Sequence, residues 1–211
     1  MNWSANWGMR FAKSAATDQS GRHPQAAIRM IISYNFYYAR PGNAAAVLQQ
    51  RIRASDVRAQ LGLPRGRIIS KIDGDGDWPD VIWRLDFADM AAQDADMQAR
   101  AASAEFEAIR HGMRQLYRRF ERPLYAPCTD LLPPEQQSMM LYGLYCDASA
   151  SAAARAMLNA VHAVEFISGG TDIPQIICET ATTGMPKSTL AKLEQLPARV
   201  EHSVWRIADQ G

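Results

Sequence analysis

The stretch "SYNFYYARPGNAAA" (Ser33 to Ala46) joins an aromatic run to a proline–glycine pair and a run of alanines. Aromatic and β-branched side chains are typical of strands, so residues 30–39 are predicted to form one. The proline–glycine pair predicts a turn, and Asn43 is a candidate N-cap for a helix that begins at the alanines. The stretch therefore predicts a strand, a turn and a helix in direct succession.

Residues 65–128 extend this beginning into a complete supersecondary unit. "RGRIISKID" and "DVIWRLDF" are predicted strands, and "ERPLYAPC" is a short closing strand that Pro123 confines to a sheet edge. Residues 88–120 are predicted to form one long helix, because Phe106, Ile109 and Met113 recur at steps of three and four. The order β-α-β-β-α-β is that of a ferredoxin-like unit.

The chain then starts the same pattern again. "LYGLYCDASASAAA" (residues 141–154) aligns with the opening stretch without a gap and places Tyr142 opposite Tyr34 and Tyr145 opposite Tyr37. The elements that follow are a helix over 150–164, strands over 165–170 and 174–181, a helix over 187–196 and a strand over 199–209. We therefore predict an N-terminal arm, packed on the body or on a second chain, and two ferredoxin-like units of which the second is shorter: residues 1–29, 30–130 and 138–211.

The segment "DGDGD" after the second strand resembles the start of a calcium-binding EF-hand loop. Such a loop, beginning at Asp73, needs glycine at its sixth position and glutamate at its twelfth. Those positions hold Trp78 and Arg84, and both flanks are predicted strands rather than helices. The segment is therefore predicted to be the turn of a β-hairpin, in which the Asp-Gly pairs supply the required positive φ angles.

Composition and charge argue against several classes of function. The 211 residues are 47% hydrophobic and 21% charged, as in folded soluble proteins, and a net charge of +1 does not favour nucleic acid as a partner. No run approaches the roughly 18 apolar residues that a membrane span needs. Three scattered cysteines form neither a disulfide framework nor a metal cluster, so we expect a cytoplasmic protein without a bound metal.

The two strand-to-helix stretches "YNFYYARPGNAAAVL" and "VIWRLDFADMAAQDADMQARAASAEFEAIRHGMRQL" resemble the dimeric α/β-barrel superfamily. The second stretch is similar to its antibiotic-biosynthesis-monooxygenase-like and NIPSNAP-like members, in which an aromatic residue ends a strand and leads into an Ala-rich helix. The resemblance implies an α+β fold of tandem ferredoxin-like units, whose antiparallel sheets form an α/β barrel, and a homodimer. The barrel closes either within one chain or between each unit and a symmetry mate.

Strand alternation sorts the candidate site residues by face. On the third strand, Arg84 and Asp86 share a face that we expect to line the cavity, where Arg84 binds a substrate carboxylate or carbonyl and Asp86 assists catalysis. The competing interpretation is a structural salt bridge between these two residues.

The first strand offers aromatic and amide candidates. Asn35 and Tyr37 form its more polar face and could donate to a substrate oxygen, and Tyr34 and Tyr145 are further candidates for substrate binding. Aromatic side chains in strands also serve plain packing, which is the alternative for all three tyrosines.

The last strand holds the acid–base candidate. His202 alternates there with Arg206, and a histidine is the natural proton-transfer group near neutral pH. If their face lines the cavity, His202 is a catalytic residue and Arg206 binds substrate.

Two functions follow from the resemblance and from these residues. The first is an enzyme without a tightly bound cofactor that acts on an aromatic or polyketide-like small molecule inside the barrel, by monooxygenase-type or isomerase/cyclase-type chemistry. The second is a non-catalytic ligand-binding or assembly protein of the same fold. Convergence of Arg84, Asp86 and His202 on one enclosed space favours the enzyme, whereas an apolar barrel interior favours the second function.

Overall fold

The computed structural model describes residues 30–74, 76–134, 136–170 and 173–208, and the predicted arm over residues 1–29 lies outside them. In chain order the elements are β1 (Ile31–Ala39), α1 (Ala44–Gln60), β2 (Arg67–Gly74), β3 (Val81–Phe87), α2 (Met90–Ala101), α3 (Ala104–Met113), β4 (Tyr117–Glu121), β5 (Leu124–Pro127), β6 (Ser138–Tyr145), α4 (Ala148–Met157), β7 (His162–Ser168), β8 (Ile176–Ala181), α5 (Lys187–Leu193) and β9 (Arg199–Ile207).

The strands form an antiparallel sheet that closes into a barrel within this single chain. The order β3-β2-β9-β6-β8-β7-β5-β1 returns to its start because β1 also pairs with β3, and β4 continues from β1 beside β5. The first part of the chain contributes β4/β5-β1-β3-β2 and the second part β9-β6-β8-β7, and the pairs β2–β9 and β5–β7 join them. The α+β barrel predicted from the sequence is confirmed.

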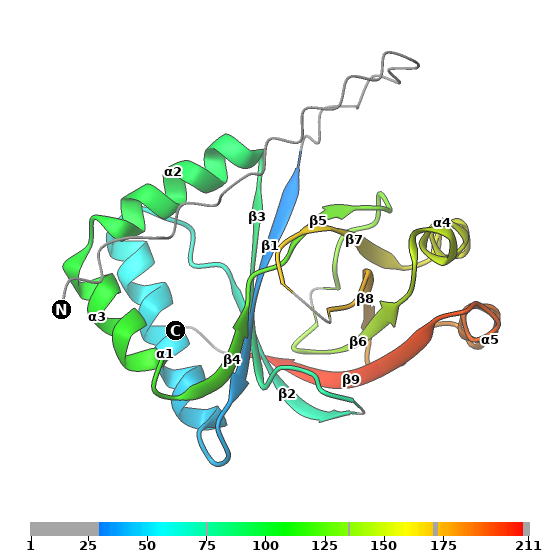
Figure 1. Cartoon of the computed structure of the whole chain (residues 1–211), viewed down its shortest axis with the longest axis horizontal. Coiled ribbons are helices and arrows are strands. Elements are labelled where there is room, and N and C mark those ends of the chain that lie inside the picture. Colours follow the sequence, from blue (N-terminus) through cyan, green and yellow to red (C-terminus); the bar gives the residue numbers. More distant parts are fainter. Residues whose placement is uncertain (1–29, 75, 135, 171–172, 209–211) are drawn as a thin grey trace, which may run out of the picture.

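The helices cover the outside of this barrel on two opposite sides (Figure 1). α1, α2 and α3 pack together against the wall formed by β1, β3 and β4, whereas α4 and α5 lie on the far side, against the second part of the chain. Within the described ranges, no helix is long and apolar enough to cross a membrane.

Alternation along β1 divides the core into an interior and an exterior layer. All nine residues of β1 are buried, because one face fills the barrel and the other lies under the helices. Tyr34 and Phe36 belong to the interior cluster, whereas Tyr37 belongs to the cluster packed against α1 and α3. The interior cluster is almost wholly apolar and aromatic: Ile32, Tyr34, Phe36, Tyr38, Ile69, Trp78, Ile82, Tyr125, Met139, Leu141, Val164, Ile177 and Trp205.

The region predicted as one long helix is two helices and a strand. α2 ends at Ala101, and Ser103 begins α3 as an N-cap whose side chain accepts a hydrogen bond from the Phe106 amide at 3.2 Å. Residues 117–121 then form β4, since their aromatic side chains pack on β1. The apolar spacing continued through both junctions, so periodicity alone could not locate them.

The hairpin prediction is confirmed, because β2 and β3 pair antiparallel on either side of the Asp-Gly segment, from Ser70 opposite Val81 to Arg67 opposite Arg84. The helix predicted over 150–164 is too long. α4 ends at Met157, and His162 begins β7, where it is buried.

Candidate functional site

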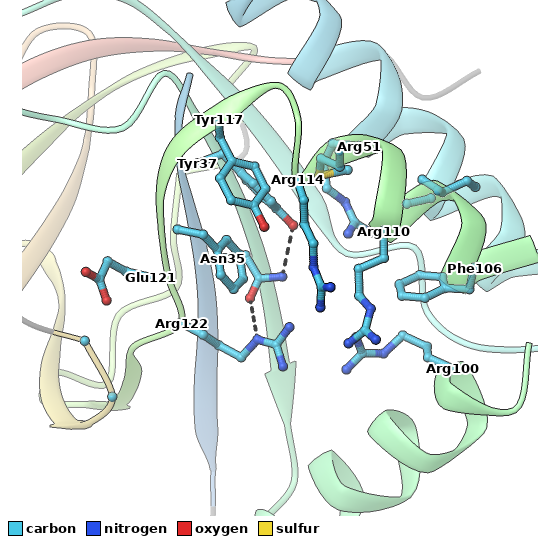
Figure 2. Close-up of a pocket in the computed structure, with 16 residues that line it drawn as sticks. Asn35, Tyr37, Arg51, Arg100, Phe106, Arg110, Arg114, Tyr117, Glu121 and Arg122 are labelled. Carbon is cyan, nitrogen blue, oxygen red and sulfur yellow. Dashed lines mark hydrogen bonds between the residues drawn. The ribbon is translucent and has the colours of Figure 1, made fainter. Parts of the chain in front are cut away.

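A cavity of about 350 Å³ lies outside the barrel, between the β1–β4 wall and the three helices of the first part of the chain (Figure 2). Pockets of this size accommodate a small organic molecule. Arginine, aromatic and apolar side chains share the lining: Asn35, Tyr37, Arg51, Ala54, Arg100, Phe106, Ile109, Arg110, Met113, Arg114, Tyr117, Phe120, Glu121, Arg122, Gly169 and Gly170. We call this cavity the arginine pocket.

At one side of the arginine pocket, hydrogen bonds connect Tyr37 and Asn35 of β1 with Arg122. The Asn35 amide donates to the Tyr37 hydroxyl at 3.3 Å, and its carbonyl oxygen accepts from Nε of Arg122 at 3.2 Å (Figure 2). Because the amide is engaged on both sides, it fixes the tyrosine hydroxyl and the guanidinium relative to each other. The Tyr37 hydroxyl and the Arg122 guanidinium are therefore held in a fixed relative geometry at the pocket.

Five arginines line the pocket, and carboxylates compensate only some of them. Nε of Arg100 pairs with Asp96 at 2.7 Å, and Arg110 pairs with Glu107. Within the described ranges, no ion pair is formed by the other three arginines, which are Arg51, Arg114 and Arg122. Among the described residues, guanidinium groups therefore outnumber the carboxylates that pair with them in the pocket.

Arg51 is the deepest of these side chains. It is 3% exposed, its guanidinium lies 4.7 Å from the centroid of the Trp83 ring, and Nη2 donates to Ser55 at 3.3 Å. Its Nε has no hydrogen-bond partner among the described residues. The pKa of Arg51 lies below its ordinary value because burial disfavours the charge; Tyr37 partly offsets this, and Arg58 and Arg100 add repulsion.

An aromatic wall faces these charges. The rings of Tyr37, Phe120 and Tyr117 lie within 5.1 to 6.0 Å of one another, and the Phe106 ring lies under the Arg100 guanidinium at 5.4 Å. Aromatic faces beside guanidinium groups suit a flat ligand that carries negative charge.

A second polar cluster lies inside the barrel. Glu179 on β8 accepts from the Tyr34 hydroxyl at 2.7 Å and from Nη1 of Arg84 at 2.6 Å, and Arg84 also binds Asp86 through two nitrogens at 3.0 and 3.2 Å. Burial raises the pKa of Glu179, but Arg84, His162, Tyr34 and Arg67 lower it, and the net pKa lies below the usual value. Because each nitrogen of the Arg84 guanidinium binds a protein carboxylate, this cluster is a structural network.

The structure divides the predicted site residues among three places. Arg84, Asp86 and Tyr34 meet in the barrel network, where the arginine and aspartate form the salt bridge that was the alternative interpretation. Asn35 and Tyr37 do not face the barrel interior; they line the arginine pocket outside it.

The last strand presents its candidates to the outer surface. On β9 the interior positions are those of Ser203 and Trp205, so His202 and Arg206 point outward and are exposed. His202 stacks on Tyr142, which belongs to the outer cluster under α4. Tyr145 lies beside Arg199, whose guanidinium is 4.0 Å from its ring. His202 therefore does not converge with Arg84 and Asp86, because the face of β9 that carries it lies outside the barrel and the condition set for its catalytic role is not met.

Sequence reasoning missed the arginines of the pocket. Arg114 and Arg122 lie in "MRQLYRRFER", which is typical of the solvated side of a helix, and Arg51 and Arg100 stand in other helices. A usable signal was Arg51 itself, which lies four residues after Val47 and hence on the apolar side of α1. Among the described residues, no group of His, Cys, Asp and Glu side chains is placed to hold a metal ion.

No protein-family model matches the sequence, and no curated protein matches it either. Solved structures do match. An "anthrone oxidase-like protein" has a TM-score of 0.55 at 7% identity, over 87% of this chain and 93% of that one. A "putative monooxygenase" from Lactobacillus acidophilus has a TM-score of 0.54 at 12% identity, over 87% and 97% of the two chains. One from Fusobacterium nucleatum has a TM-score of 0.50 at 8% identity, over 87% and 94%.

At these identities the likeness shows the fold alone. The chain has the ferredoxin-like α/β-barrel fold that its strand-to-helix stretches resemble, so this resemblance is confirmed at the level of the fold.

Proposed function

We propose that this chain is a small-molecule enzyme of the monooxygenase type, which binds an aromatic substrate in the arginine pocket. The observation that carries the proposal is the pocket, since a cavity of about 350 Å³ presents an aromatic wall opposite converging guanidinium groups. The names of two structural neighbours, an anthrone oxidase-like protein and a monooxygenase, support this class of reaction.

The pocket favours the deprotonated form of a bound aromatic molecule. A phenol or an acidic ring methylene placed beside uncompensated guanidinium groups becomes a stronger acid, because its conjugate base is stabilised electrostatically. That electron-rich anion is the form that reacts with molecular oxygen. When O₂ oxidises a ring methylene to a carbonyl, one oxygen atom enters the product and the other leaves as water with the two hydrogens.

Three side chains have roles in this scheme. Arg51 and Arg122 stabilise the substrate anion, because they are the inner cations without a carboxylate partner among the described residues. Tyr37, held by Asn35, donates a hydrogen bond to the substrate oxygen and orients the ring. The only reactants in this scheme are the substrate and O₂.

Oxygen uptake tests this proposal. The purified protein is mixed with a panel of anthrones, hydroxynaphthalenes and catechols, and O₂ consumption is followed together with quinone absorbance. We expect uptake with at least one compound, and a loss of about tenfold or more in Arg51→Met and Tyr37→Phe. Arg53→Gln is the matched control, since Arg53 lies on the same helix but is 62% exposed and outside the pocket lining.

A second candidate is a non-catalytic ligand-binding protein that uses the same pocket. It is favoured by the barrel interior, which apolar side chains and a paired ion network fill, and by the outward position of His202. The same experiment separates the two, because a compound that raises the melting temperature without O₂ uptake or any product identifies the binding protein.

A further inference from the structure

The charge of the arginine pocket exceeds what its own carboxylates neutralise. Figure 2 shows the side chains of all five arginines reaching into one space, while Glu121, the carboxylate of the lining, lies apart from them. Asp96 and Glu107 pair with Arg100 and Arg110. Three guanidinium groups therefore stand without an ion-pair partner among the described residues.

The close approach of these buried guanidinium groups to one another is electrostatically unfavourable. Burial lowers the pKa of Arg122, and repulsion from Arg100, Arg110 and Arg51 lowers it further, although Tyr37 offsets part of this. Arg51 is buried with an unpartnered Nε, which is a donor left unsatisfied in the protein interior. A ligand with acceptor oxygens in the pocket offsets the repulsion among these guanidinium groups.

The excess of positive charge in the arginine pocket also determines the charge that a ligand should carry. A single carboxylate compensates one of the three unpaired guanidinium groups, and a group with two negative charges compensates two. Planar guanidinium forks bind phosphate and carboxylate oxygens through paired hydrogen bonds. Glu121 keeps a negative charge at one edge of the pocket, which limits how much further anionic charge the site accepts.

We propose that the ligand of the arginine pocket is an aromatic dianion, either an aryl phosphate or a benzene ring with two neighbouring carboxylates. This inference rests on the proposed function, because it concerns the same pocket and names the charged group that the aromatic substrate carries beside its oxidisable position. The ring packs on Tyr37, Tyr117 and Phe120, and the two negative charges meet Arg51, Arg114 and Arg122.

Calorimetric titration with probes of similar size and different charge tests the inference near neutral pH. The probes are benzamide, benzoate, phthalate, phenyl phosphate and inorganic phosphate. We expect phthalate or phenyl phosphate to bind about tenfold or more tightly than benzoate, and benzamide to bind weakest. The ratio between the affinities for the dianion and for benzoate should fall at high salt, because salt screens the charges. The two aromatic dianions distinguish the two sources of charge.

Variants locate the dianion. Arg114 is exposed at the pocket, so Arg114→Gln removes a charge without disturbing the core. We expect it to weaken binding of the preferred dianion about tenfold and to weaken benzoate less. Arg51→Met should act in the same direction, and the exposed Arg53→Gln should leave every affinity unchanged.

The outcomes separate this inference from the proposed function. Equal affinities for benzoate and both dianions, or no binding of any probe, overturns the dianion. If O₂ uptake is nevertheless found with an uncharged or monoanionic ring compound, the proposed function stands without it. Inorganic phosphate could bind as tightly as phenyl phosphate, with no O₂ uptake for any compound. That result would support a doubly charged ligand but contradict both its aromatic ring and the proposed enzyme.

Discussion

Nη1 of Arg84 donates to Oε2 of Glu179 at 2.6 Å, although the two residues stand 95 positions apart on β3 and β8. Both side chains are buried, and the Tyr34 hydroxyl donates to the other carboxylate oxygen at 2.7 Å. Since β3 comes from the first part of the chain and β8 from the second, the pair links the two parts across the inside of the barrel.

Removal of one partner should destabilise the protein strongly. Arg84→Met leaves Glu179 charged in the interior without its main counter-ion, so we expect a loss of about 3 kcal/mol in the free energy of unfolding. The double variant Arg84→Met/Glu179→Leu should lose less than the sum of the single changes, because it leaves neither charge unpaired. Urea denaturation of the four proteins measures both quantities.

Arg118→Gln serves as the control, because Arg118 and Asp77 form an ion pair with side chains 49% and 55% exposed. Exposed pairs contribute about 0.5 kcal/mol. A loss in Arg84→Met no larger than that in Arg118→Gln would refute the structural role of the barrel network.

The same carboxylate should govern stability in acid. The pKa of Glu179 is lower in the folded protein than in the unfolded chain, so the unfolded chain binds the proton first. The contribution of Glu179 is therefore complete above the unfolded pKa of about 4.3 and is lost as the pH falls through the folded value. Glu179→Gln should make the free energy of unfolding less dependent on pH below that value. Thermal melts across the acid range can detect this change.

Much of the fold could be predicted because each element carries its own local signal. The aromatic run of β1, the turn before α1 and the alternation in β3 are short-range patterns, and they placed Ile82 and Arg84 on the barrel side and Trp83 under the helices. The boundaries at Ser103 and Tyr117 were missed because amphipathic spacing runs through them.

The site was harder to predict because it is assembled over long distances. Alternation shows that His202 and Arg206 share a face, but it does not show which face of β9 turns inward, and Trp205 occupies the interior instead. The arginine pocket draws charges from α1, α2, α3 and the β4–β5 connection. Apart from Arg51, which lies on the apolar side of α1, each arginine alone looks like an ordinary surface residue. Only their convergence marks the site.

Gly66 should tolerate no side chain. It has a φ of +73°, and a Cβ atom there would lie 2.2 Å from Nε1 of Trp83. Gly66→Ala combines a left-handed backbone with overpacking, so we expect a loss of about 3 kcal/mol in the free energy of unfolding. Gly62 has nearly the same φ, +72°, but a Cβ atom there would meet nothing within 4 Å, so Gly62→Ala should lose only about 1 kcal/mol. Equal losses in urea denaturation would mean that the indole does not crowd Gly66.

Arg51 and Arg58 are two similar buried arginines, and comparing them shows how a carboxylate partner affects stability. Both stand buried on α1 and stack on the Trp83 ring, at 4.7 and 4.8 Å from its centroid. Arg58 binds both oxygens of Asp96, at 2.6 and 3.1 Å, whereas no described carboxylate pairs with Arg51. The fold thus pairs the charge of Arg58 with a carboxylate, whereas the charge of Arg51 has no carboxylate partner among the described residues.

The two methionine variants should therefore change stability in opposite directions. Arg58→Met takes the main partner from a buried aspartate and should lose about 3 kcal/mol in the free energy of unfolding. Arg51→Met removes an unpaired buried charge while keeping apolar volume against Trp83, so we expect the ligand-free protein to gain about 1 kcal/mol. Urea denaturation without added anion measures both changes. A loss in Arg51→Met comparable to that in Arg58→Met would show that Arg51 is needed for folding, and the charge excess would then no longer point to a ligand.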